Sequence, residues 1–313
     1  MEPLLSLQIF AGMLVLVAAS GLFIHSLVHV GRMLKIREDL IIFVLVGFAT
    51  ALPELFIGLN AIITNTQDIA VGNAIGTSIA ALSFVAGMVA VFSRKFKTDS
   101  FFEHHDLTTL SVATVFLFIL ASDGALSRLD GAILLVVFIY YLWNVIDQKH
   151  KLTVKVAESR HNLFVHIVVL LITGVSIFLA SQYVVFSAYF LEQLTFLPGV
   201  LIALVLIAPM GIVPELIIEF ELIRNRSHKL SFGDLFTSVI INTTLVVGLV
   251  AFIKPFGIGN QMLLSFSGVF LLLVILLFNL FAKSRKEIDW KEGLILVLAY
   301  FMFIINCFLI NRI

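Results

Sequence analysis

Long apolar runs, separated by short polar stretches, dominate the pattern of hydrophobic and polar positions along this chain. An α-helix needs about 20 consecutive apolar residues to cross the hydrocarbon core of a bilayer. The runs approach or exceed this length, so the pattern predicts ten transmembrane helices. The predicted segments are 4–30, 40–63, 69–92, 106–122, 131–147, 161–190, 198–223, 231–253, 260–282 and 292–311.

The composition agrees with a membrane protein. Of the 313 residues, 60% are hydrophobic and only 13% are charged. So few charges do not cover the surface of a soluble protein of this length, so the lipid bilayer is the expected surrounding. The formal net charge of zero gives no sign of a nucleic-acid partner. Cys307 is the single cysteine, which excludes a disulfide framework and fits a small buried side chain.

The basic residues alternate between loops and so predict how the segments cross the membrane. Counted from the N-terminus, odd-numbered loops carry 17 of the 20 lysine and arginine residues. Only Arg128, Lys254 and Arg312 fall elsewhere. Because basic loops stay in the cytoplasm, we expect an integral protein of the cell membrane with both termini outside.

One apolar run contains an acidic residue directly after a proline. Pro53 and Glu54 lie near the middle of segment 40–63, which has no other charge. A carboxylate at that depth costs about 3 kcal/mol and is usually functional. The proline lacks a backbone donor and so frees a carbonyl, which must face protein or a wet cavity. A carboxylate beside freed carbonyls offers a hard cation the oxygen ligands that replace its water.

The same arrangement occurs again 161 residues later, where Glu215 follows Pro214. Eighteen residues after each acid comes a related motif, GNAIGT at 72–77 and GDLFTS at 233–238. This match at one offset, without a gap, indicates a duplication. Duplicated broken segments are the best sequence pointer to the binding site of a transporter.

The duplication and the charge pattern together predict the fold. An odd number of helices in each half makes the two halves antiparallel in the membrane. The expected fold class is therefore an all-α polytopic membrane protein with ten helices in two inverted five-helix repeats. The repeats are predicted to cover 1–152 and 153–313.

Polar residues four positions apart share one face of a helix. Four of the predicted helices each carry one such polar stripe. The stripes are Thr50 with Glu54, Asn73 with Thr77, Glu215 with Glu219, and Asp234 with Ser238 and Asn242. Because lipid offers them no partner, we expect the stripes to face the bundle interior and to meet near the midplane.

These motifs resemble the two alpha repeats of the calcium/cation antiporter superfamily, which includes the sodium/calcium exchangers. The motifs cover roughly 47–81 and 208–242, and the ten-segment plan extends the resemblance over the whole chain. The resemblance implies cations bound among helices 2, 3, 7 and 8. It also implies that helices 1 and 6 slide across this core to alternate access.

The resemblance assigns ion-binding roles to residues at matching positions. Glu54 and Glu215 match the paired acids that bind the cations. The other matches are the side-chain ligands Thr50, Thr77, Ser238 and Asn242, and the backbone-carbonyl positions Ala49 and Ala208.

The chain departs from the family pattern at several positions. Ala81 stands where the first repeat normally has Asn, and Ala51 replaces a common Ser. Gly211 and Ile212 replace a hydroxyl pair, and Asp234 replaces the Asn of the second Gly-Asn. Sodium sites in the family use such hydroxyl and amide groups, so the usual three-sodium stoichiometry is not carried over to this chain.

Several polar residues have more than one interpretation. Asp234 fits a transport role, but it also fits a structural role in neutralising a local charge or capping its helix. Glu219 lies one turn from Glu215, which fits either a wetted helix end or the ion pathway. His25 and His29 lie one turn apart and fit either an interfacial position or a pH sensor.

The sequence predicts a secondary antiporter that has no enzyme activity and needs no cofactor. Two glutamates match the charge of one Ca²⁺ or of two monovalent cations, so competition for the pair would couple Ca²⁺ to Na⁺ or H⁺. Protons fit because burial favours the neutral form of a carboxyl group.

Two alternatives stay open on the residues alone. One is a cation/proton antiporter of other specificity, and the other is a channel or sensor on the exchanger fold. An intramembrane hydrolase is disfavoured, because His-Glu-x-x-His and Gly-x-Ser-x-Gly motifs are absent.

Overall fold

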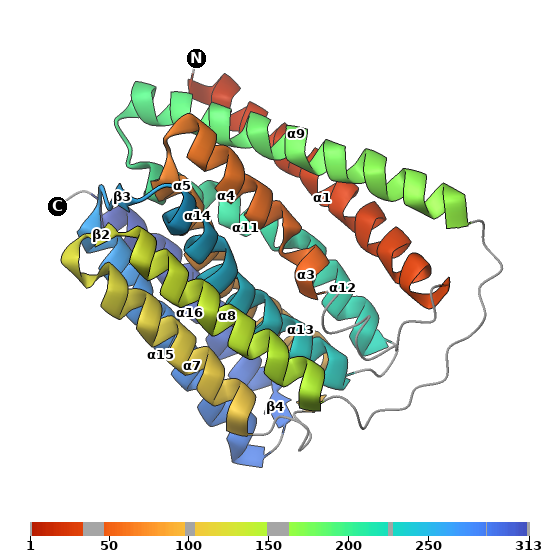
Figure 1. The fold of residues 1–313 in the computed structure, drawn as a ribbon. Helices are drawn as coiled ribbons and strands as arrows, with labels where there is room; N and C mark the ends of the chain where they lie inside the picture. The colour runs from red at the N-terminus through yellow and green to blue at the C-terminus, as the bar shows by residue number, and fades with distance from the viewer. Residues whose placement is uncertain are drawn as a thin grey trace.

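The computed structural model describes residues 2–33, 47–97, 104–148, 163–224, 228–285 and 287–311. These residues form a bundle of helices with four very short strands (Figure 1). Helices α1 (Glu2–Met33) and α9 (Leu163–Thr195) lie side by side along one face of the bundle. The predicted all-α class is confirmed.

The elements of the first half follow α1 in short pieces. They are α3 (Gly47–Thr50), α4 (Leu52–Thr64), α5 (Gln67–Ala80), the π-helical turn η2 (Ala81–Val85), α6 (Ala86–Ser93), β1 (Lys95–Lys97), α7 (His104–Leu120), the 3₁₀ turn η3 (Ala121–Asp123), β2 (Ala125–Leu126) and α8 (Arg128–Gln148).

The second half continues after α9 in the same manner. Its elements are α10 (Gly199–Ile202), the π-helical turn η5 (Ala203–Ile207), α11 (Ala208–Gly211), α12 (Val213–Arg224), α13 (His228–Ile240), the π-helical turn η6 (Ile241–Val246), α14 (Val247–Ile253), β3 (Phe256–Gly257), α15 (Gln261–Arg285), β4 (Glu287–Asp289) and α16 (Trp290–Ile310).

Within the described ranges, seven helical segments are long and apolar enough to cross a membrane. They are Leu4–Gly31, Gln67–Ser93, Leu163–Thr195, Gly199–Arg224, Gly233–Ile253, Gln261–Ala282 and Trp290–Ile310. Two shorter apolar helical segments are Leu52–Thr64 and Thr109–Asp123. The start of predicted segment 40–63, the first two residues of 161–190 and the predicted boundary at 152 and 153 lie outside the described residues.

Large apolar side chains cover the outside of this bundle. Leu171 on α9, Val136 and Trp143 on α8 and Leu22 on α1 are all exposed. Contiguous apolar surface of this kind marks contact with lipid or a partner rather than with water. The outer surface therefore fits a bilayer.

The strands pair at opposite ends of the bundle. β1 pairs antiparallel with β4, and β2 pairs antiparallel with β3. Figure 1 shows β2 and β3 at the end where α1 begins and β4 at the other end. We call these the β2–β3 end and the β4 end.

Glycines allow two pairs of helices to cross closely. A Cβ atom on Gly87 of α6 would lie 2.6 Å from the carbonyl oxygen of Gly293 on α16. A Cβ atom on Gly131 of α8 would lie 2.7 Å from the carbonyl oxygen of Gly248 on α14. Neither space admits a side chain, and small residues at crossings are how membrane helices bring their backbones together.

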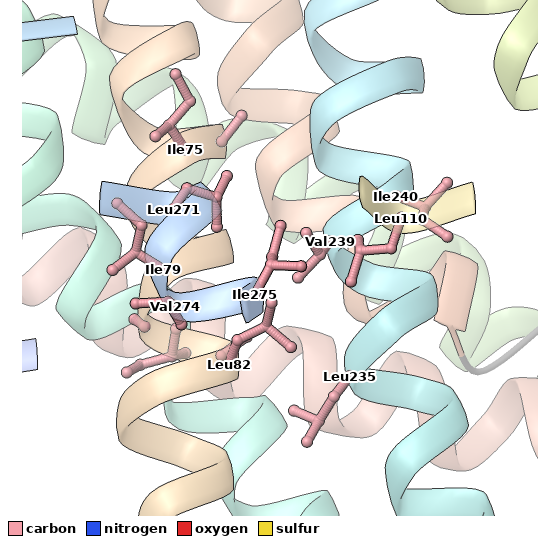
Figure 2. Packing of buried hydrophobic residues seen from close by; sticks show 14 of the residues in the cluster. Ile75, Ile79, Leu82, Leu110, Leu235, Val239, Ile240, Leu271, Val274 and Ile275 are labelled. Atoms are coloured by element: carbon pink, nitrogen blue, oxygen red, sulfur yellow. The ribbon is translucent and has the colours of Figure 1, made fainter. Parts of the chain in front are cut away.

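The largest apolar core lies around α5, α13 and α15. Figure 2 shows Ile79 of α5, Val239 of α13 and Ile275 of α15 packed within it. Leu235 and Val239 share one face of α13, whereas Asp234 and Ser238 share the neighbouring face, because each pair is four residues apart. Because Leu235 and Val239 are packed in the core, the orientation of α13 is fixed, and with it the orientation of Asp234 and Ser238.

Candidate functional site

Both proline-linked acids lie in the first turn of a helix that follows a break. Glu54 is the third residue of α4 and follows Pro53, while Glu215 is the third residue of α12 and follows Pro214. The first backbone N–H groups of a helix have no partner inside it, and the helix dipole is positive there. The breaks thus give each carboxylate a favourable position inside an apolar bundle.

Both carboxylates are buried and only partly hydrogen-bonded. Glu54 is 2% exposed and Glu215 is 3% exposed. Ser238 of α13 donates a hydrogen bond to Glu215 Oε1. In the described part of the chain, the Oε2 atoms of both glutamates are buried without a hydrogen-bond partner. Glu54 and Glu215 are close enough for their charges to interact.

Two contacts join the first half of the chain to the second at this place. Asn242 Nδ2 of η6 donates to Thr77 Oγ1 of α5 over 3.1 Å. A Cβ atom on Gly211 of α11 would lie 3.3 Å from Glu54 Oε1 and 3.2 Å from Thr77 Cγ2. Residues from four separate helical segments therefore lie around the Glu54 carboxylate and the Thr77 hydroxyl.

The threonine hydroxyls use their protons within their own helices. Thr50 Oγ1 donates to the carbonyl oxygen of Gly47 over 2.9 Å, and Thr77 Oγ1 donates to that of Asn73 over 2.8 Å. Such bonds are common for threonine in helices. Each hydroxyl oxygen keeps lone pairs of the kind that a cation needs, although Thr77 Oγ1 also accepts from Asn242 Nδ2.

The two predicted carbonyl positions differ in their backbone environment. Ala49 and Ala208 are both buried. Pro53 follows Ala49 by four residues and has no N–H to donate to its carbonyl. The carbonyl of Ala208 accepts from the backbone N of Ile212 over 3.3 Å.

Sequence reasoning overlooked another carbonyl. Pro214 follows Met210 by four residues, so by the i−4 rule for proline the Met210 carbonyl has no i+4 donor, and the backbone N–H of Ile212 points toward it instead. Applying that rule to Pro214 would have found this position.

The structure decides between the interpretations of Asp234 and Glu219. Asp234 is 3% exposed and lies well inside α13, which begins at His228, so it does not cap the helix. Glu219 is 0% exposed within α12. The wetted helix end considered for Glu219 is therefore wrong.

Asn73 was placed by the sequence on the same polar stripe as Thr77 but was not assigned an ion-binding role. It is buried, and both its Oδ1 and Nδ2 atoms have no hydrogen-bond partner among the described residues. A buried amide without partners is costly. The first motif therefore presents a second polar group beside Thr77.

The described residues contain no group of three or more His, Cys, Asp or Glu side chains that could hold a metal ion. A cation bound between Glu54 and Glu215 would need further oxygens from hydroxyl, amide or carbonyl groups. Hard cations such as Ca²⁺ accept these ligands. Ser238 contacts Glu215, and Asn242 contacts Thr77, so their side-chain oxygens lie near the two acids.

The two histidines of α1 lie near a third on α9. His25 and His29 have ring centroids 4.3 Å apart, and the ring of His166 stacks on that of His29 at 4.8 Å. These rings join α1 to α9. Cys307 is buried, as expected.

Fold and site together define the class: a helical integral membrane protein with buried carboxylates between broken helices. A family model described as sodium/calcium exchanger protein matches residues 4–146 and 165–309. The chain therefore belongs to the sodium/calcium exchanger family.

Similar proteins occur in archaea and bacteria. The chain is 23% identical to the sodium/calcium exchanger MaX1 of Methanosarcina acetivorans, over 97% of this chain and 98% of that protein. It is 26% identical to the putative antiporter CaxA of Alkalimonas amylolytica, over 93% of this chain and 95% of that protein. These relatives are transporters and not enzymes.

Solved structures share the fold. The H⁺/Ca²⁺ exchanger CAX superimposes with a TM-score of 0.74 at 16% identity, over 97% of this chain and 87% of that chain. The sodium-calcium exchanger NCX_Mj superimposes with a TM-score of 0.64 at 20% identity, over 96% of this chain and 97% of that chain.

Proposed function

We propose that this protein is a secondary antiporter that exchanges Ca²⁺ for Na⁺ or H⁺ at a site formed by Glu54 and Glu215. One observation carries the proposal: each buried glutamate keeps a carboxylate oxygen without a hydrogen-bond partner in the described structure. The buried charged side chains of the described residues include no lysine, arginine or histidine. A buried carboxylate needs a cation or a proton, and a transported ion meets that need.

The ligands of the divalent ion are proposed from the contacts around the two acids. Thr77 and Asn242 touch each other, and Ser238 touches Glu215. Thr50 and the carbonyls of Ala49 and Ala208 complete the proposed ligand set. Oxygen ligands of mixed charge and neutral type suit Ca²⁺.

We also propose that the chain consists of two inverted repeats of five transmembrane helices, 1–152 and 153–313. Several pairs of elements support it. α4 begins at Leu52 and α12 at Val213, which is the 161-residue offset of the acids. The glycine crossing between α6 and α16 has a counterpart between α14 and α8. The β1–β4 pairing likewise has a counterpart in β3–β2.

Alternating access is proposed to use movement of α1 and α9 across the other helices. Their contact with the core is mainly apolar and includes Met13 and Val184. Apolar contacts are non-directional, so one set can replace another as the helices slide. Asn60 Nδ2 of α4 donates to Ser181 Oγ of α9 over 2.8 Å, and this bond must break when α9 moves.

The positive-inside pattern supports placement in the cell membrane with both termini outside. The β2–β3 end would then face outward and the β4 end would face the cytoplasm, since Arg128 and Lys254 lie beside β2 and β3.

The test is uptake of labelled Ca²⁺ into proteoliposomes that contain the purified protein, driven separately by Na⁺, K⁺ and H⁺ gradients. We expect uptake by the wild type with Na⁺ or H⁺ and loss of uptake in Glu54→Gln and Glu215→Gln. Asp123→Asn is the matched control, because it removes an exposed carboxylate that is not part of the proposed site.

Full uptake in both glutamine variants would refute the two-glutamate site. Flux that persists without any ion on the opposite side would identify a channel on the exchanger fold. A different transported cation with the same dependence on both glutamates would identify an antiporter of other specificity.

A further inference from the structure

A third carboxylate, that of Asp234, lies near the Glu54–Glu215 pair, and the proposed two-glutamate site does not require it. Asp234 is 3% exposed, and its Oδ1 atom is buried with no hydrogen-bond partner among the described residues. Its charge acts on Glu215. A buried carboxylate oxygen with nothing to bind is costly unless a cation or proton completes it.

The position of Asp234 is displaced from the pair along the bundle. Asp234 lies one helical turn before Ser238, which donates to Glu215, and one turn is about 5.4 Å. α13 begins on the β4 side, because it packs against β1. Asp234 therefore lies nearer the β4 end than the contact between Ser238 and Glu215.

The backbone of α3, which belongs to the first half of the chain, packs against Asp234. A Cβ atom on Gly47 would lie 3.6 Å from Asp234 Oδ1 and 2.7 Å from Thr237 Cγ2. Thr237 Oγ1 and Tyr141 OH are hydrogen-bonded over 2.8 Å. The backbone of α3 thus lies against the buried carboxylate oxygen of Asp234, and an added side chain at Gly47 would meet Thr237.

A role as a helix cap does not fit Asp234, because it lies well inside α13. Among the residues whose side chains the structure describes, no lysine, arginine or histidine is buried. When all three neighbouring carboxyl groups are ionised they carry three negative charges, and one Ca²⁺ neutralises two of them.

We propose that Asp234 forms a second cation subsite, for Na⁺, on the β4 side of the Glu54–Glu215 pair. The inference rests on the proposed function, because it assigns the monovalent ion of the exchange to its own carboxylate. Na⁺ at Asp234 weakens Ca²⁺ binding at Glu215 through repulsion between the two cations. Because the subsite lies on the β4 side of the pair, Na⁺ arriving from that side of the membrane reaches it without first passing Glu54 and Glu215.

The experiment measures equilibrium binding of labelled Ca²⁺ and of labelled Na⁺ to the purified full-length protein at constant pH. In Asp234→Asn, we expect Ca²⁺ affinity within about threefold of the wild type. We expect about tenfold more Na⁺ to be needed to displace Ca²⁺, and direct Na⁺ binding to fall by about one ion per protein.

Two further variants keep the result interpretable. Asp234→Glu retains the charge and should retain Na⁺ displacement of Ca²⁺. Thr243→Val removes a buried hydroxyl that bonds only within its own helix and should change neither ion. Monodisperse gel filtration of each variant checks that it is folded.

Unchanged Na⁺ binding in folded Asp234→Asn would overturn the subsite. Loss of Ca²⁺ binding in that variant, to the level of Glu54→Gln, would also overturn it, because Asp234 would then belong to the divalent site. A third outcome separates the two proposals. If the wild type binds no Ca²⁺, but Asp234→Asn binds one Na⁺ fewer than the wild type, the proposed exchange fails and the Na⁺ subsite stands.

Discussion

The two acidic segments of the molecule share a backbone plan but carry different side chains. In both, a glutamate follows a proline in the first turn of a helix, α4 in one case and α12 in the other. At the common offset, Thr50 of the first segment corresponds to Gly211 of the second, where no hydroxyl is present. Asn242 of the second half corresponds to Ala81 of the first. Each half therefore lacks a polar group that the other supplies.

Negative charge is also unequal between the halves. Glu219 and Asp234 correspond by the same offset to Gly58 and Asn73. Both extra acids are buried, and both lie toward the β4 end from Glu215. The two acidic segments thus share a helix break but differ in their number of buried acids. If the proposed site is correct, its negative charge is concentrated toward the β4 end.

The largest effects are expected where the two halves remain alike. Glu54→Gln and Glu215→Gln each remove one of the two carboxylates proposed to bind the divalent ion, so each should lower Ca²⁺ transport by at least about 100-fold. Initial rates of labelled Ca²⁺ uptake provide the measurement. A large loss in only one variant would show that the two acids are not equivalent.

The next largest effect is expected at Gly211, where the second acidic segment has no side chain. A Cβ atom on Gly211 would lie 3.3 Å from Glu54 Oε1 and 3.2 Å from Thr77 Cγ2. Gly211→Val should therefore displace both groups and weaken Ca²⁺ binding about tenfold or more. The same measurement on Gly21→Val, at a position with open space around it, is the control. Equal affinities for Gly211→Val and the wild type would show that Gly211 does not border the site.

A smaller effect is expected from the amide that only the second half carries. Asn242→Ala removes the 3.1 Å bond to Thr77 Oγ1 and should weaken Ca²⁺ binding about fivefold. Adding Ala81→Asn to this variant exchanges the amide between halves and should restore part of the affinity. Ca²⁺ titration of the single and double variants measures the exchange. No recovery in a folded double variant would mean that the halves are not interchangeable at this position.

The smallest effect is expected from the hydroxyl on Glu215. Ser238→Ala removes the bond from Ser238 to Glu215 but leaves both charges in place. We expect Ca²⁺ affinity to fall about threefold, as measured by the same titration. Thr244→Val, which removes a hydroxyl bonded to the Ile240 carbonyl, should have no effect. A loss as large as that of Glu215→Gln would make Ser238 indispensable for positioning the acid.

Much of the fold follows from local features of the sequence. Apolar runs predicted the helical segments, and the described helices α5 to α6, α8 and α16 begin and end within a few residues of them. The sequence did not predict the π-helical turns η2, η5 and η6. Hydrophobic periodicity does not distinguish a π-helical turn from an α-helical one, and Thr243 and Ser83 bond to carbonyls in their own helix there.

The site was predictable only as a set of residues. Pro53 with Glu54 and Pro214 with Glu215 reveal the helix breaks, because proline acts on its own backbone. Whether Asn242 touches Thr77, or Asp234 lies against Gly47, depends on how helices cross, and helix crossing is set by packing of distant side chains.

By itself, the sequence determined that this protein is helical, suited to a membrane, and equipped with two proline-linked acids 161 residues apart. These properties arise from composition, run length and residue spacing, which need no knowledge of neighbours in space. Only the tertiary structure decided that Glu219 is buried and that Asp234 has a buried oxygen, without a hydrogen-bond partner among the described residues, beside α3. Burial and hydrogen bonding are properties of an environment, and segments far apart along the chain build that environment.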